Sequence, residues 1–205
     1  NQCFNRQIQL PSGLMEYGAK PIIADVNNDN LDDIVFYYLN SNTDSLQINT
    51  FFNDGNGGFT DSVFYIEGIE KAYYRFFIML EYVNQDQYPD LLFISDGPSE
   101  DTLNILMGSG DGTFTLGYKS SYPFSGGYNY QYYNHYFLDI NNDNYKDLVT
   151  AQYSNYDNAS GKTEVFLNNQ GILSFDTLYT FSVDFCADFN SDSLFEFLVR
   201  EPSKF

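Results

Sequence analysis

Short apolar runs and polar loops alternate along the chain, and no stretch has helical periodicity. Four apolar runs, "PIIA", "FFIML", "HYFL" and "VDFCA", each precede an acidic loop, and a second apolar run follows each loop. Short apolar runs on both sides of a turn-rich loop predict two β-strands joined as a hairpin. The pattern therefore predicts an all-β chain.

A second kind of turn follows three of these hairpins. An apolar run leads into a Gly-rich or Asn-rich turn in "INTFFNDGNGGF", "LNILMGSGDGTF" and "TEVFLNNQGILSF", and another β-type run comes after each turn. These turns supply the positive φ angles that a tight strand reversal needs. Four short antiparallel strands in each repeating unit predict the blade of a β-propeller.

The acidic loops set the length of the repeat. They lie in "ADVNNDNLDDIV" (24–35), "EYVNQDQYPDLLF" (81–93), "LDINNDNYKDLV" (138–149) and "ADFNSDSLFEFLV" (187–199), and their first positions fall at residues 25, 82, 139 and 188. We expect one repeat domain over 1–205, with blades near 20–76, 77–133, 134–182 and 183–205, the last of them partial. An N-terminal strand within 1–12 could close a small four-bladed ring. Alternatively, the propeller is incomplete, either as a fragment or as a subunit whose open edge another chain completes. The lack of a third strand in the last blade favours this alternative.

Each acidic loop offers oxygen ligands at regular positions. Side-chain oxygens stand at loop positions 1, 3, 5 and 9, and position 7 offers its carbonyl. Asn and Asp also make turns without any ion, but the recurrence of charge at positions 1, 5 and 9 favours a hard cation, and calcium over magnesium. The loops contain no His or Cys, which argues against zinc. The second loop has Tyr82 at position 1, and alternation turns Glu81 to the other strand face.

With these loops and turns, the chain resembles the FG-GAP/VCBS-type repeat proteins, which include the β-propellers of integrin alpha subunits. The resemblance implies two to four Ca²⁺ ions and a secreted or cell-surface adhesion module. It implies calcium ligands at Asp25, Asn27, Asp29, the Leu31 carbonyl and Asp33; at Asp139, Asn141, Asp143, the Tyr145 carbonyl and Asp147; and at Asp188, Asn190, Asp192, the Leu194 carbonyl and Glu196. The second loop keeps a reduced set of Asn84, Asp86 and Asp90.

Charge and cysteine content narrow the possible partners. The formal net charge of -19 argues against nucleic acid, and no apolar run is long enough to span a membrane. Cys3 and Cys186 lie near opposite ends and are expected to form a disulfide in an oxidising compartment, with two unpaired buried thiols as the alternative. Asn158 begins an "NAS" glycosylation sequon.

The remaining candidates concern recognition and catalysis. Tyr128, Tyr130, Tyr132 and Tyr133 form an aromatic-rich stretch that is either a ligand surface for a protein or glycan or packing between blades. His135, the single histidine, is expected to be structural. No nucleophile, phosphate or dinucleotide motif is present. We therefore expect a non-catalytic binding module, with a structural subunit of an extracellular assembly as the second hypothesis and a glycan hydrolase as a remote third.

Overall fold

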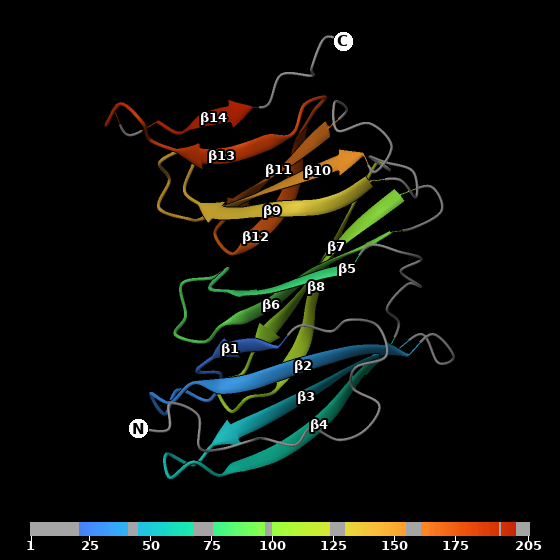
Figure 1. Cartoon of the computed structure of the whole chain (residues 1–205), viewed down its shortest axis with the longest axis vertical. Helices are drawn as coiled ribbons and strands as arrows, with labels where there is room; N and C mark the ends of the chain where they lie inside the picture. The colour runs from blue at the N-terminus through green and yellow to red at the C-terminus, as the bar shows by residue number, and fades with distance from the viewer. Residues whose placement is uncertain are drawn as a thin grey trace, which may run out of the picture. The chain divides into compact units, whose positions relative to one another are not determined.

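The computed structural model describes residues 21–40, 45–67, 76–96, 100–123, 130–154, 161–192 and 194–199. All regular elements in these ranges are β-strands (Figure 1). The fourteen strands are β1 (Ile22–Ala24), β2 (Asp33–Asn40), β3 (Ser45–Asn53), β4 (Phe59–Glu67), β5 (Phe76–Glu81), β6 (Asp90–Asp96), β7 (Glu100–Gly108), β8 (Phe114–Pro123), β9 (Tyr130–Leu138), β10 (Asp147–Ser154), β11 (Gly161–Asn169), β12 (Ile172–Tyr179), β13 (Val183–Ala187) and β14 (Glu196–Val199). Within the described ranges, no helix has the length and hydropathy that a membrane crossing requires.

The strands form four antiparallel sheets in chain order. The first sheet is β1-β2-β3-β4, the second β5-β6-β7-β8, the third β9-β10-β11-β12, and the fourth consists of β13 and β14. Every hydrogen-bonded neighbour pair runs antiparallel. The predicted all-β architecture of three four-stranded units and a partial fourth is therefore confirmed. The expected N-terminal strand at 1–12 lies outside the described residues.

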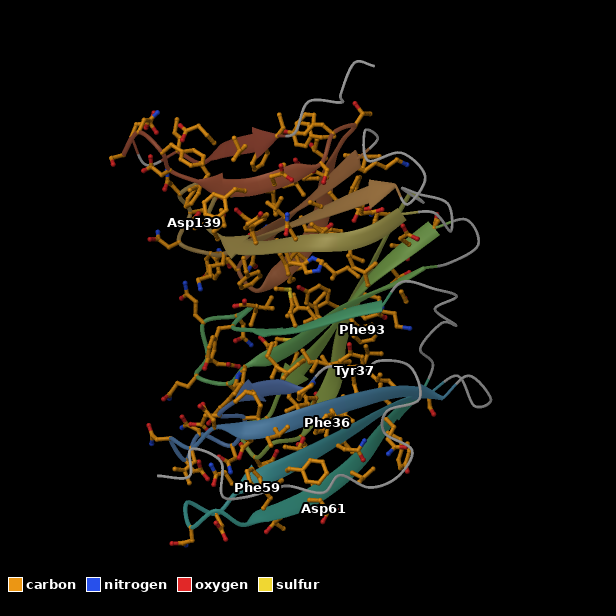
Figure 2. All side chains as sticks on the ribbon, in the orientation of Figure 1. Phe36, Tyr37, Phe59, Asp61, Phe93 and Asp139 are labelled. Carbon is orange, nitrogen blue, oxygen red and sulfur yellow. The ribbon has the colours of Figure 1, made fainter. Side chains whose placement is uncertain are left out.

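The chain divides into two compact units. One contains the first sheet, and the other contains the second, third and fourth sheets. In the first unit, Phe36 and Phe51 pack edge to face with ring centroids 5.9 Å apart, and Ile34 and Phe59 pack against them. This cluster, in which Phe36 and Phe59 are labelled in Figure 2, is the apolar core of the first sheet.

The turns between third and fourth strands follow local sequence chemistry. Between β11 and β12, Gln170 and Gly171 have φ angles of 54° and 95°, and Asn169 pairs with Ile172 across the turn. Positive φ at both central residues matches the right-handed twist of the two strands. Between β3 and β4, the Asp54 carboxylate accepts the backbone N–H groups of Asn56 and Gly58, both at 2.8 Å.

The main core of the second unit lies between the second and third sheets of the chain. Side chains alternate between the two faces of a strand, so Leu92 and Ile94 of β6 face the third sheet. Leu148 of β10 and Phe166 of β11 face back toward them, and all four are fully buried in one cluster. Tyr122 stacks on Phe175 at 5.3 Å and meets Phe166 edge to face at 5.0 Å.

Polar side chains also cross between the second and third sheets. The Tyr118 hydroxyl donates to the Gly171 carbonyl at 3.1 Å and accepts the backbone N–H of Leu173. The fully buried Glu164 carboxylate accepts from Thr150, Gln152 and Tyr122 at 2.9, 2.6 and 3.3 Å. These bonds satisfy polar groups that would be costly to bury alone.

The fourth sheet packs on the outer face of the third. Val183 and Cys186 of β13 are buried with Ala151 of β10, and Tyr136 and Phe197 pack around them. The Tyr136 hydroxyl donates to the Asp184 carbonyl at 2.6 Å, and the Thr163 hydroxyl donates to the Phe181 carbonyl at 2.8 Å. The third sheet therefore presents one face to the second sheet and the other face to the fourth.

Phe166→Ala tests the core between the second and third sheets. Loss of a fully buried ring should lower the free energy of unfolding by about 3–5 kcal/mol, because the rigid sheets cannot collapse into the cavity. Ile172→Ala is the control, since Ile172 is 59% exposed and should change stability by less than about 0.5 kcal/mol. Urea titrations followed by circular dichroism measure both. Equal losses in the two variants would contradict this account of the core.

Candidate metal-binding loops

The four acidic loops occupy equivalent places in the four sheets. Each joins the first strand of its sheet to the second: β1 to β2, β5 to β6, β9 to β10 and β13 to β14. Position 9 of each loop is the first residue of the second strand, at Asp33, Asp90, Asp147 and Glu196. The predicted hairpins around the loops are therefore present. Asp139, labelled in Figure 2, is position 1 of the third loop, at the end of β9.

The carboxylate at position 9 ties the loop to the rest of its sheet. Asp147 is fully buried, and its two oxygens accept the backbone N–H groups of Ile140 at 3.0 Å and Asn168 at 2.8 Å. Asp90 repeats this arrangement with the N–H groups of Val83 and Gly108, both at 3.0 Å. One oxygen thus holds loop position 2, and the other holds the end of the third strand.

The first and fourth loops contain parts of the same arrangement. Asp33 is fully buried and accepts the N–H of Asn53, at the end of β3, at 2.9 Å. Glu196 accepts the N–H of Phe189 at 2.8 Å and the side-chain amide of Asn190 at 2.9 Å. In the fourth sheet, as far as the structure describes it, Glu196 is half-buried and its second oxygen is bound to the loop instead of a third strand.

The carboxylate at position 1 organises the curl of the loop. In the third loop, the two Asp139 oxygens accept the N–H groups of Asp143 at 3.0 Å and Asn144 at 2.8 Å. Asp25 does the same in the first loop with the N–H groups of Asp29 and Asn30, at 3.1 and 2.8 Å. In the fourth loop, Asp188 accepts the N–H of Asp192 at 3.1 Å.

The curl requires a left-handed backbone at particular positions. Positions 4 and 6 have positive φ in the first loop, at Asn28 (61°) and Asn30 (67°), and in the third loop, at Asn142 (61°) and Asn144 (71°). Position 4 of the fourth loop, Ser191, has φ of 62°. Asn tolerates this conformation better than most residues. The alternating Asn residues therefore shape the loop, a role that the sequence analysis did not assign to them.

The side chains at positions 3 and 5 meet in three of the loops. The Asn141 amide donates to an Asp143 oxygen at 3.0 Å, and the equivalent bonds join Asn84 to Asp86 at 2.8 Å and Asn190 to Asp192 at 3.1 Å. The other oxygen of the position-5 Asp accepts the N–H of position 7, at 2.8 Å in all four loops. Position 7 is thereby held where its carbonyl was predicted to serve as a ligand, at Leu31, Tyr145 and Leu194.

The second loop departs from the other three. Tyr82 is 52% exposed and provides no carboxylate at position 1. Positions 4 and 6 are Gln85 and Gln87, and neither is among the described residues with positive φ. The ring of Tyr88 instead packs over the turn between β7 and β8, where a Cβ added to Gly110 would lie 2.2 Å from it. An aromatic contact therefore supports this loop where the others use a carboxylate.

Burial and mutual repulsion raise the energy of the ionised carboxylates. The pKa of Asp147 lies above its usual value, chiefly because burial disfavours the charged form, and Asp143 and Asp139 add like-charge repulsion. The pKa of Asp90 is raised for the same first reason, with a contribution from Asp86. Backbone hydrogen bonds oppose both shifts without cancelling them. A cation near these groups would favour their ionised forms.

The donor set of the first, third and fourth loops fits a hard cation. It consists of carboxylate, amide and carbonyl oxygens, the ligands that calcium takes in proteins. In the described part of the chain, no three His, Cys, Asp or Glu side chains lie close enough together to hold an ion in the present arrangement. Ligation would therefore draw the carboxylates inward from their hydrogen bonds with the loop backbone.

Comparison with protein families identifies part of this arrangement. The family model of the FG-GAP-like repeat matches residues 83–150. That range begins at position 2 of the second acidic loop and ends within β10. It contains the strands β6 to β9 and the whole third loop. The chain contains an FG-GAP-like repeat. Searches of curated proteins and of solved structures returned no significant match.

The loop pattern of the matched range recurs before and after it along the chain. The first and fourth loops have the same residue spacing as the third, although they lie outside the matched range. The backbone curl and the position-5 contacts of these loops also agree with those of the third loop. The predicted resemblance to FG-GAP/VCBS-type repeat proteins is therefore confirmed.

Several predicted residues lie outside the FG-GAP-like loops. Cys186 is a buried thiol with no disulfide partner among the described residues, and burial raises its pKa to about 11. Cys3, Asn158 and Tyr128 lie outside the described residues. Tyr130, Tyr132 and Tyr133 fall in β9, but their side chains are not described. The disulfide, the glycosylation site and the tyrosine surface remain predictions.

His135 lies in β9 opposite Thr150, with its Nδ1 atom buried. Burial lowers its pKa to about 4. In the unfolded chain an ordinary histidine gains a proton near pH 6.5. The folded state cannot easily accept that proton, so acidification below pH 6.5 favours unfolding.

Asp147→Ala tests the position-9 carboxylate in calcium-free protein. It leaves the N–H groups of Ile140 and Asn168 without their acceptors and should lower the free energy of unfolding by about 2–4 kcal/mol. Asp143→Ala is the matched control in the same loop, because Asp143 is exposed, and should cost less than about 1 kcal/mol. Both variants are measured by urea unfolding in chelator. A loss in Asp143→Ala as large as that in Asp147→Ala would refute the structural role of position 9.

His135→Gln tests the buried histidine. Between pH 7 and pH 5, wild type should lose about 2 kcal/mol more unfolding free energy than the variant, because only wild type contains the histidine whose folded pKa is depressed. The other titrating groups are common to both proteins and cancel in the difference. Urea titrations at the two pH values measure it. Parallel losses in the two proteins would show that His135 is protonated as readily in the fold as outside it.

Proposed function

We propose that the chain is an extracellular, calcium-binding β-propeller-type module that recognises a protein or glycan ligand and catalyses no reaction. The observation that carries the proposal is the repetition of one loop architecture in the first, third and fourth sheets. In each of these loops a position-1 Asp accepts backbone N–H groups, and a position-5 Asp holds position 7. Each of these loops also has a third carboxylate at position 9, so three like charges stand within nine residues, and a divalent cation would offset their repulsion.

Calcium would act as a structural ion in this module. The expected ligands in the third loop are Asp139, Asn141, Asp143, the Tyr145 carbonyl and Asp147, with equivalent sets in the first and fourth loops. A divalent cation among these side chains would offset the repulsion between carboxylates that the fold places within one turn. It would also hold together the first two strands of a sheet at the loop that joins them.

Recognition and location are proposed from the FG-GAP-like repeat and the chain's charge. FG-GAP repeats are typical of extracellular proteins, where free calcium is abundant and disulfides such as Cys3–Cys186 persist. The net charge of -19 suits a basic or calcium-bridged partner and disfavours nucleic acid. The blade loops and the tyrosine-rich stretch of Tyr128, Tyr130, Tyr132 and Tyr133 are the proposed contact region.

Calcium removal tests the proposal through stability. If free calcium is about 20 times the Kd, each occupied site adds roughly 1.8 kcal/mol, so three sites add on the order of 5 kcal/mol. Chelation should then lower the Tm by roughly 10 °C or more, with recovery in calcium and much weaker recovery in magnesium. Differential scanning calorimetry of the same sample in chelator, calcium and magnesium measures this. An unchanged Tm would eliminate calcium binding.

Position 5 offers a matched pair of variants for the same measurement. Asp143→Asn should remove about one third of the calcium-dependent shift, because it replaces a carboxylate of the third loop. Asp86→Asn makes the same change in the second loop and should leave the shift nearly intact, since that loop lacks the position-1 carboxylate. Equal effects would mean that the second loop also binds calcium.

Ligand recognition requires a separate assay. Wild type should be retained on a glycan array or on a panel of extracellular proteins in calcium, and released by chelator. Turnover of an arrayed glycan would contradict the non-catalytic proposal, while binding that is unaffected by chelator would separate recognition from the calcium loops.

A further inference from the structure

Asn168, near the end of β11, connects several segments of the second unit and is 1% exposed. Its backbone N–H binds the carboxylate of Asp147, and its side-chain oxygen accepts the N–H of Gly171 in the β11–β12 turn, both at 2.8 Å. Its side-chain amide donates to the Val83 carbonyl of the second loop at 2.8 Å and to the Lys146 carbonyl of the third loop at 2.9 Å. One buried side chain therefore joins the third loop, the tight turn of its own sheet and the second sheet.

Two of these bonds act on the segment between two predicted calcium ligands. Lys146 is position 8 of the third loop, between the Tyr145 carbonyl at position 7 and the Asp147 carboxylate at position 9. The Asn168 amide fixes the peptide group of Lys146, and the Asn168 backbone N–H orients the Asp147 carboxylate. Groups that hold metal ligands from outside commonly set the affinity of a metal site. Asn168 therefore lies where a positioning residue of the third loop would lie.

The first sheet repeats these contacts with its own loop. The N–H of Asn53 binds Asp33, at position 9, at 2.9 Å, and the Asn53 amide donates to the Asp32 carbonyl, at position 8, at 3.2 Å. The Asn53 side-chain oxygen accepts the N–H of Gly55 in the following turn at 3.0 Å. Asn53 therefore holds the first loop as Asn168 holds the third.

The second sheet has glycine at this place. The N–H of Gly108 binds Asp90 at 3.0 Å, which makes Gly108 the equivalent of Asn168. A Cβ on Gly108 would lie 2.2 Å from the carbonyl oxygen of Pro89, at position 8, so no side chain fits there. The second loop is also the one that has Tyr82 in place of a carboxylate at position 1. Among the three four-stranded sheets, the asparagine thus accompanies the two loops with a full set of predicted ligands.

The contact with Val83 carries this arrangement beyond the third sheet. Val83 is position 2 of the second loop and is buried in the core between the second and third sheets. The turn that Asn168 holds through Gly171 also meets the second sheet. There, the Tyr118 hydroxyl of β8 donates to the Gly171 carbonyl at 3.1 Å and accepts the N–H of Leu173. The side chain that orients the third loop is therefore itself held by the packing of two sheets.

We propose that Asn168 couples calcium binding in the third loop to the packing of the third sheet on the second. This coupling rests on the calcium binding proposed above, and it makes the third site depend on a neighbouring sheet. While Val83 and the turn hold Asn168 in place, its amide keeps the Lys146 peptide group in one orientation, so less ordering of the loop opposes calcium binding. Because coupling is reciprocal, calcium in the third loop should also stabilise the contact between the two sheets.

Calcium titrations of the full 205-residue chain, followed by hydrogen exchange and mass spectrometry, test the proposal. Peptides covering 138–147 and 24–33 report the third and first loops separately, so each site gives its own Kd. Asn168→Gly introduces the residue that the second sheet has at this place and keeps the N–H that binds Asp147. It should weaken calcium binding in the third loop by about 10-fold or more and leave the first loop unchanged. Asn53→Gly is the matched control and should weaken the first loop alone.

Tyr118→Phe tests the coupling from the second sheet. It removes the hydroxyl that binds Gly171 and Leu173, while every calcium ligand and every bond of Asn168 stays in place. We expect calcium binding in the third loop to weaken by about 3-fold or more, with the first loop unchanged. In wild type, calcium should also slow hydrogen exchange in residues 169–175, which contain the turn. Asn168→Gly should lose this protection even when its third loop is saturated with calcium.

The outcomes separate the coupling from the proposed function. If calcium changes hydrogen exchange in no loop of wild type, calcium binding and the coupling are both overturned. If the loops of wild type respond and Asn168→Gly keeps the wild-type Kd in its third loop, calcium binding stands and the coupling is overturned. A purely structural Asn168 would behave in this way, because its loss would lower stability to urea in chelator without changing the affinity of the folded protein.

Two further results decide between a local role and coupling. A third loop that is weakened by Asn168→Gly but not by Tyr118→Phe would show that Asn168 acts within its own sheet alone, which overturns the coupling. If circular dichroism shows that Asn168→Gly is unfolded, Tyr118→Phe decides by itself: a weaker third loop supports the coupling, and an unchanged Kd refutes it.

Discussion

A carboxylate at the first residue of the second strand, buried in each of the three complete sheets, holds the repeating unit together. In the third sheet, Asp147 accepts one N–H from the acidic loop and another from the end of the third strand, 21 residues further along the chain. Through these two hydrogen bonds, one side chain fixes the start of the acidic loop relative to the end of the third strand. Asp90 repeats the pair in the second sheet. Since a buried charge without partners is costly, both segments must be in place before the carboxylate can be accommodated.

The same end of the sheets also mediates the contact between the second and third sheets. Asn168, whose backbone N–H binds Asp147, uses its side-chain amide to reach the Val83 carbonyl in the second sheet. Gly171, in the following turn, lies against Asn84 so closely that an added Cβ would be 3.1 Å from that side chain. The acidic loop of the second sheet and the tight turn of the third therefore form a continuous contact. An ion held in the third loop, whose Lys146 carbonyl accepts from the same Asn168 amide, would stiffen this contact as well as its own hairpin.

Much of this arrangement could be predicted from the sequence because the signals are local. Alternating apolar runs, turn dipeptides and the repeated acidic spacing placed the strands and loops in the correct order. The structural role of Asp147 was not predicted, since it depends on a backbone N–H that only the folded sheet brings near. The left-handed backbone at Asn28 and Asn30 could have been predicted from residue type, because Asn tolerates positive φ. Gln85 and Gln87, at the same positions of the second loop, could likewise have marked that loop as different. The exposure of Phe185 on the fourth sheet needed the structure, because it depends on which strands lie beside it.

Repeated sheets can misassemble during folding, because similar faces can pair with the wrong neighbour. The buried residue four positions before the one whose N–H binds the position-9 carboxylate is Asn in the first and second sheets, Asn49 and Asn104, but Glu164 in the third. At the interface between the second and third sheets, Glu164 needs the Tyr122 hydroxyl from the other sheet in addition to Thr150 and Gln152. A wrongly chosen neighbour would leave that hydrogen bond unmade in a dry environment. Glu164 thus makes the contact between the second and third sheets specific, because only the correct neighbouring sheet supplies the Tyr122 hydroxyl.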